Sequence, residues 1–85
     1  MLRILFFYTE WCEPCKPVLE ILNDINNNYK IDLELIDGEM MPDVADKYNV
    51  NAYPTVIVLK SDKKVKSICG YRNPEVYYNL VEVET

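Results

Sequence analysis

The sequence contains no histidine and only three cysteines, Cys12, Cys15 and Cys69. Structural zinc and iron–sulfur sites usually need four Cys or His ligands. Because the chain can offer three at most, we expect neither a metal nor another cofactor. Three cysteines are also too few for the disulfide framework of a small secreted domain, and an odd number leaves one unpaired.

A surplus of basic residues is also absent. Nine Lys and Arg stand against 14 Asp and Glu, which gives a net charge of -5 and a pI near 4.6. Nucleic acids and anionic membrane surfaces attract basic proteins. We therefore expect neither nucleic acid nor a membrane as a partner.

Long hydrophobic segments are missing as well. The apolar run at residues 4–8 is too short for a signal-peptide core and far too short to span a bilayer. With no export signal visible, we expect a cytoplasmic protein, in a compartment where thiols are mostly reduced. A Cys-x-x-Cys pair there is more often catalytic or metal-binding than structural.

The composition is that of one ordinary globular domain. The chain has 85 residues, of which 49% are hydrophobic and 27% charged. Such a length supports a single core, and the sequence has no repeat or linker-like stretch. We expect one domain over residues 1–85, acting as a monomer.

Hydrophobic periodicity predicts an alternating order of strands and helices. The order β-α-β-α-β-β-α predicts an α/β fold with a mixed four-stranded sheet and helices on both faces. We expect the first helix to fray at residues 26–28, and Tyr29, Tyr48 and Tyr77 to face the core. Strands are expected at residues 2–8, 31–36, 55–59 and 65–69, a hairpin turn at 61–64, and helices from Pro14, over 42–48 and from Asn73.

Cys12 and Cys15 are placed where a thiol is reactive. They follow the first strand and open the first long helix, whose unpaired N–H groups and dipole stabilise an anion. The pKa of a thiol at such a position falls from ~8.5 to about 7 or lower. Cys12, nearer the helix end, is the expected nucleophile, and Cys15 the thiol that resolves the mixed disulfide.

The residues around the pair favour a reductant. Glu13 places a negative charge near the Cys12 thiolate, which opposes a very acidic and strongly oxidising thiol. Lys16 partly offsets that charge. Pro17 removes one helical hydrogen bond, and we expect a kink there.

Two motifs resemble the thioredoxin family. Residues 10–16 (EWCEPCK) look like its active-site signature, with Glu13 where glycine is usual, and residues 47–55 (KYNVNAYPT) look like the segment with its cis-proline. Gly70 matches a glycine of the active-site rim. The first strand–helix unit of full-length thioredoxins is missing, so the resemblance implies a minimal thioredoxin fold of glutaredoxin size.

The resemblance implies a thiol–disulfide oxidoreductase that reduces protein disulfides through Cys12 and Cys15. Substrates would bind along Trp11, Tyr53, Pro54 and Gly70, with Pro54 cis. A thioredoxin reductase-like donor would restore the dithiol, and targets would include ribonucleotide reductase and other cytosolic disulfide enzymes. The alternative is a thioredoxin-fold binding module in which the cysteines are incidental.

Several residues depart from the family pattern. Phe6 stands where a buried Asp is usual, and Leu35 where its Lys partner is common, so the proton of Cys15 must leave by another route. Water and Asp37 are the candidates. Tyr53 is bulkier than the usual Ile and narrows the range of partners. Cys69 is expected to be a buried, apolar cysteine close to the site.

Overall fold

The computed structural model describes residues 2–84. The predicted order of elements is confirmed, and the boundaries differ by at most a few residues. Strand β4 begins two residues earlier than expected because the hairpin turn consists of Ser61 and Asp62 alone, both with positive φ. The elements are β1 (Leu2–Tyr8), α1 (Cys15–Asn28), β2 (Ile31–Asp37), α2 (Pro42–Lys47), β3 (Thr55–Lys60), β4 (Lys63–Cys69) and α3 (Pro74–Glu84).

The strands form one mixed sheet in the order β2-β1-β3-β4. Strands β1 and β2 run parallel and are joined through α1, as in a βαβ unit. Strand β3 runs antiparallel to β1, with Thr55 opposite Phe7, and β4 pairs antiparallel with β3, with Cys69 opposite Thr55. The ends of β1 and β4 and the start of β3 therefore meet at one edge of the sheet.

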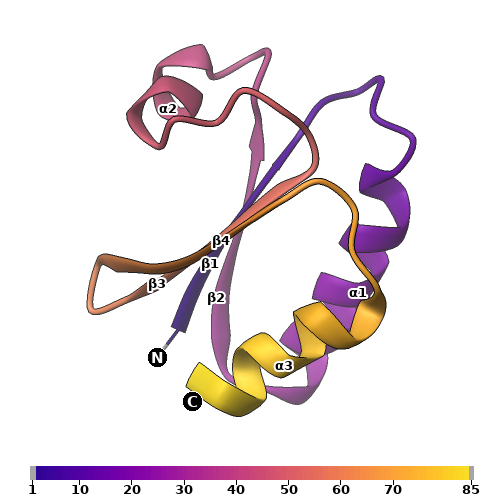
Figure 1. Cartoon of the computed structure of the whole chain (residues 1–85), viewed down its shortest axis with the longest axis vertical. Helices are drawn as coiled ribbons and strands as arrows, with labels where there is room; N and C mark the ends of the chain where they lie inside the picture. Colours follow the sequence, from indigo (N-terminus) through magenta and orange to yellow (C-terminus); the bar gives the residue numbers. More distant parts are fainter. Residues whose placement is uncertain (1, 85) are drawn as a thin grey trace.

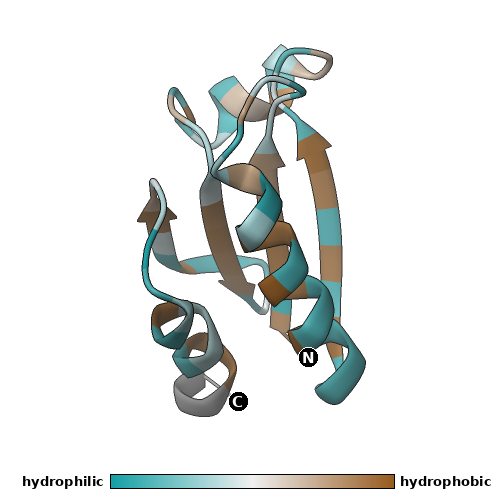
Figure 2. Ribbon diagram, turned by 90° about the vertical axis from the view of Figure 1, so that its right-hand side faces the viewer, coloured by the Kyte–Doolittle hydropathy of each residue, from teal (hydrophilic) through white to brown (hydrophobic). Residues whose placement is uncertain are grey.

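Side chains of β1 alternate between two cores. Leu2, Ile4 and Phe6 face helices α1 and α3, whereas Leu5 and Phe7 belong to a second cluster that contains Ala45 of α2. Figure 1 shows the sheet nearly edge-on, with α1 and α3 on one side and α2 on the other. In Figure 2 the two central strands are predominantly hydrophobic, whereas α1 turns a largely hydrophilic surface outward. This arrangement confirms the predicted sheet with helices on both faces.

Helix α1 buries one of its faces, on which Val18, Leu22 and Ile25 are fully buried. Helix α1 ends at Asn28, inside the run where we expected it to fray, and the Asn28 side-chain amide donates to the Asp24 carbonyl at 2.8 Å. Tyr29 lies just beyond the helix and is exposed, so its predicted place in the core is wrong. The chain has turned toward β2 at that point, which takes Tyr29 off the helical face.

Proline and asparagine set the beginning of α3. Pro74 is the first helical residue, and the Asn73 carbonyl accepts from the Val76 amide at 3.0 Å. Pro suits this position because its missing N–H would have no helical partner there. Tyr77, Leu80 and Val81 are buried against the sheet, which confirms the predicted place of Tyr77 in the core. Among residues 2–84, no helix is both long and apolar enough to cross a membrane.

Candidate active site

Three loops meet at the edge of the sheet where β1 and β4 end and β3 begins. Residues 9–14 join β1 to α1, residues 48–54 lead into β3, and residues 70–73 join β4 to α3. The register places Phe7, Thr55 and Cys69 side by side at this edge. The segments that carry the two sequence motifs, far apart in the chain, are thus brought together.

Cys12 and Cys15 form a disulfide across a turn that leads into α1. Their Cα atoms are 5.3 Å apart, and the Cys15 amide donates to the Cys12 carbonyl at 3.2 Å. Pro14 is the N-cap and Cys15 the first helical residue, one position later than expected. Cys12 is partly accessible, whereas Cys15 is only 5% exposed.

The charges next to the disulfide largely cancel. The Lys16 ammonium lies 3.2 Å from the Glu13 carboxylate, and both side chains are mostly in solvent. Opposite charges this close offset each other, and solvent screens both, so neither charge acts strongly on the sulfur atoms. Pro17 occupies the third helical position, where an N–H has no partner inside the helix, so the hydrogen bond expected to be lost is not part of α1.

The segment with Pro54 is held from both sides. The Tyr53–Pro54 peptide bond is cis. The Pro54 carbonyl accepts from the Gly70 amide at 2.8 Å, and the Thr55 hydroxyl donates to the Ala52 carbonyl at 2.7 Å. Gly70 has a φ of +84°, which favours glycine. These bonds fix the backbone of Pro54 to that of Gly70.

The two aromatic residues expected at the site are placed differently. Trp11, directly before Cys12, is 76% exposed. Tyr53 is half-buried and packs against the apolar clusters on both faces of the sheet. Its phenol lies over Gly38, leaving no room for a Cβ atom at that position. Gly38 in turn donates its amide hydrogen to the Tyr8 carbonyl at 2.8 Å.

A mainly apolar cavity of about 250 Å³ opens beside the disulfide. Phe6 is 1% exposed and stacks on Tyr8 at a ring distance of 5.9 Å, so apolar packing replaces the usual buried acid. Leu35 is 46% exposed because it lies on the edge strand at the mouth of this cavity. The cavity is lined by Phe6, Tyr8, Thr9, Glu10, Cys12, Cys15, Lys16, Leu19 and Leu35.

The structure narrows the route by which Cys15 could lose a proton. Asp37 caps its own loop, where its carboxylate accepts from the amides of Glu39 and Met40 at 2.9 and 3.2 Å, and it does not line the cavity. The charged residues that do line it are Glu10 and Lys16, both exposed. The cavity is therefore the opening to solvent that lies beside Cys15.

Cys69 lies at the same edge of the sheet but is exposed, so its predicted burial is wrong. Side chains on β4 alternate, and Ile68 takes the position that faces the core under α3. Cys69 therefore points to the opposite face, where it is a free thiol. Among residues 2–84, no group of three or more His, Cys, Asp or Glu side chains could hold a metal ion.

Two residues of this region were not singled out from sequence. Gly38 accommodates the Tyr53 phenol. The chain has only two glycines, and this scarcity was the feature of the sequence that could have pointed to Gly38. Tyr77 was expected only to fill the core, but its hydroxyl reaches the loop after β4. No sequence pattern connects a helical tyrosine to a backbone segment several residues earlier.

A half-exposed cysteine bridged to a buried one at the start of a helix is suited to thiol–disulfide exchange. The accessible sulfur of Cys12 can exchange with a substrate, and the buried sulfur of Cys15 can then re-form the disulfide. Metal chemistry lacks a ligand set among the described residues. The fold and this site define a thiol–disulfide oxidoreductase.

Comparison with known proteins identifies the family. The family model described as Thioredoxin matches residues 2–82. Thioredoxins of Staphylococcus epidermidis and Staphylococcus aureus are 34% identical over 83 residues, which cover 95% of this chain and 77% of theirs. The reduced thioredoxin pre-protein of Schistosoma mansoni has a TM-score of 0.88 at 26% identity, covering 96% of this chain and 77% of its own. The chain belongs to the thioredoxin family.

The contact between Gly38 and Tyr53 gives a first prediction. Gly38→Ala is expected to lower the free energy of unfolding by about 1–3 kcal/mol, because the new methyl group overlaps the phenol and the packing must shift. In a Tyr53→Ile background the loss should shrink by at least about 0.5 kcal/mol. Urea denaturation of the four proteins measures this coupling. Equal losses in both backgrounds would show that the phenol is not the obstacle.

Proposed function

We propose that the protein reduces protein disulfides, with Cys12 as the nucleophile and Cys15 as the resolving thiol. The observation that carries this assignment is the difference in accessibility across the disulfide. Cys12 is partly exposed, whereas Cys15 is 5% exposed beneath it. A substrate disulfide can therefore reach Cys12 but not Cys15, and only Cys12 is positioned to form the first mixed disulfide.

The reaction proceeds by two exchanges. The Cys12 thiolate attacks one sulfur of the substrate disulfide, so a bond from Cys12 to substrate forms and the other substrate sulfur leaves as a thiolate that takes up a proton. Cys15 then loses its proton through the cavity and attacks the sulfur of Cys12, which releases the second substrate thiol. The substrate gains two electrons and two protons, and the Cys12–Cys15 disulfide results.

We infer from the charges around Cys12 that electrons pass from this protein to its substrates. Strong oxidants of this kind stabilise the thiolate of the reduced form. Here the neighbouring cation, Lys16, is already paired with Glu13 in solvent. Helix α1 supplies its N-terminal dipole but no further positive side chain in the immediate Cys12–Cys15 turn. The site therefore suits a reductant better than an oxidase or an isomerase.

Substrates are proposed to bind along Trp11, Tyr53, Pro54 and Gly70. Trp11 supplies an exposed aromatic surface next to Cys12. Pro54 and Gly70 form a backbone rim that is fixed by the 2.8 Å hydrogen bond between them. An extended substrate segment could pair with such a rim while its disulfide faces Cys12. Tyr53 packs against Gly38, so it supports this rim.

Membership of the thioredoxin family implies a thioredoxin reductase as electron donor and disulfide-containing proteins as targets. We further propose ribonucleotide reductase as one target. The chain is proposed to act as a single, monomeric, cytoplasmic domain. Analytical ultracentrifugation of the reduced and oxidised protein tests the monomer, since a dimer would double the mass.

A redox titration of the Cys12–Cys15 pair tests the proposed function, with Trp11 fluorescence as the signal. A two-electron midpoint near about -270 mV is expected for a reductant of the thioredoxin type. A midpoint of about -180 to -120 mV would instead indicate an isomerase or an oxidant. Absence of a two-electron transition would leave a binding module as the remaining function.

Replacing the resolving cysteine should trap substrates as mixed disulfides with Cys12. Cys15→Ser is expected to stop the second exchange, because a serine hydroxyl does not attack the mixed disulfide, so Cys12 stays bound to its partner. Adducts that disappear with a reducing agent should accumulate on a non-reducing gel. The matched control is the Cys12→Ser, Cys15→Ser double variant, which should form none. Equal adduct levels in the two variants would point to Cys69 rather than Cys12.

A further inference from the structure

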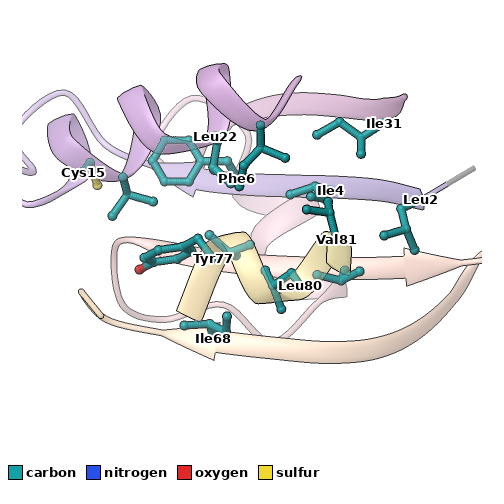
Figure 3. Close-up of a cluster of buried hydrophobic side chains, with 14 residues drawn as sticks. Leu2, Ile4, Phe6, Cys15, Leu22, Ile31, Ile68, Tyr77, Leu80 and Val81 are labelled. Carbon is teal, nitrogen blue, oxygen red and sulfur yellow. The ribbon is translucent and has the colours of Figure 1, made fainter. Parts of the chain in front are cut away.

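Tyr77 has both a buried ring and a hydrogen-bonded hydroxyl. The residue is fully buried in α3 and belongs to the cluster that contains Phe6 and Cys15. Figure 3 shows its ring extending from α3, with the hydroxyl pointing toward the end of the cluster where Cys15 lies. The hydroxyl accepts a hydrogen bond from the Arg72 amide at 3.2 Å and donates one to the Gly70 carbonyl at 3.3 Å.

These bonds connect the core to the rim of the disulfide site. Gly70 donates its amide hydrogen to the Pro54 carbonyl at 2.8 Å, while its own carbonyl accepts from Tyr77. The loop of residues 70–73 has no regular secondary structure that would fix it. Tyr77 therefore closes a continuous chain of hydrogen bonds from α3 through Gly70 to Pro54.

Packing alone does not account for the hydroxyl. A phenylalanine ring would fill the same space in the apolar cluster, because the hydroxyl is bonded to backbone groups of the loop after β4. A buried hydroxyl needs partners, and here both are backbone groups of one loop. Burial raises the pKa of Tyr77, so the phenol keeps its proton and its role as a donor throughout the neutral range.

We propose that Tyr77 is a positioning residue for protein substrates, holding the loop of residues 70–72 so that the Gly70–Pro54 rim keeps the geometry a substrate chain needs. This inference rests on the proposed function of the rim in binding protein disulfides. Tyr77 does not touch the reacting sulfur atoms through any of these bonds. It therefore affects the binding of an extended substrate but leaves the chemistry at Cys12 alone.

The experiment compares a protein disulfide with a small one. Tyr77→Phe keeps the ring and removes the hydroxyl. The KM for a disulfide-bonded protein such as insulin is expected to rise about threefold to tenfold, which corresponds to the loss of one or two hydrogen bonds. The kcat for insulin, the rate with a small aryl disulfide and the redox midpoint should stay at wild-type values. The Gly70 amide should also exchange its hydrogen faster.

Tyr78→Phe is the matched control on the same helix. It removes a phenol that donates to Asp24 on α1 at 2.7 Å, a bond that does not involve the rim. Its KM for insulin should equal that of the wild type. An unchanged KM in Tyr77→Phe, or equal losses with both kinds of substrate, would overturn the positioning role. A wild-type protein inactive on both substrates would instead overturn the proposed function itself, and this inference with it.

Discussion

Cys12→Ser is expected to lower the rate of disulfide reduction by at least about 1,000-fold, because a serine hydroxyl is not ionised at neutral pH and does not open a disulfide. Cys15 cannot take over, since its side chain lies beneath Cys12 and is 5% exposed. The measurement is insulin reduction with a chemical dithiol as the electron source, corrected for the rate of the dithiol alone. The helix and the sheet should be unaffected, because the side chain of Cys12 lies outside the regular elements.

Cys69→Ser is the matched control for this loss. Cys69 lies at the same edge of the sheet and is also accessible, but it is a free thiol and forms no bridge. Its replacement should leave the rate of insulin reduction within about twofold of the wild type, as expected for an exposed residue outside the exchange. If Cys12→Ser kept substantial activity while Cys69→Ser lost it, the assignment of the nucleophile would be wrong.

Phe6→Ala is expected to lower the free energy of unfolding by about 3–5 kcal/mol, because it removes a fully buried ring and enlarges an existing cavity. A small domain has roughly 5–15 kcal/mol in total, so the variant would be close to unfolding. Urea denaturation followed by circular dichroism measures the change. Trp11 is unsuitable as the reporter because it is 76% exposed and changes its surroundings little.

Leu35→Ala provides the comparison for Phe6→Ala. Leu35 lines the same cavity but is 46% exposed, so its truncation removes little buried surface. The expected loss is below about 1 kcal/mol. A similar loss in both variants would show that Phe6 does not carry the packing beside the disulfide.

Most of the fold could be predicted from the sequence because the strongest patterns are local. The β-branched run of β3 and the apolar run of β1 mark central strands, and Asn73 with Pro74 marks the beginning of α3. Local patterns fail to predict burial at the end of a helix and at the edge of the sheet. Tyr29 continues the helical spacing of α1 by one step but lies after the helix, and Leu35 continues the alternation of β2 but lies on an edge strand.

The sequence by itself determined the chemistry at the site. The spacing of Cys12 and Cys15 at a helix start predicts thiol–disulfide exchange, and the resemblance to the thioredoxin family adds Tyr53 and Pro54 before a central strand. Only the tertiary structure decided what surrounds this chemistry. The burial of Cys15, the exposure of Cys69 and the contact of Tyr53 with Gly38 depend on which faces of distant segments meet. The bonds from Tyr77 to Gly70 and Arg72 likewise depend on how α3 packs against the sheet, because long-range packing sets them and local sequence does not.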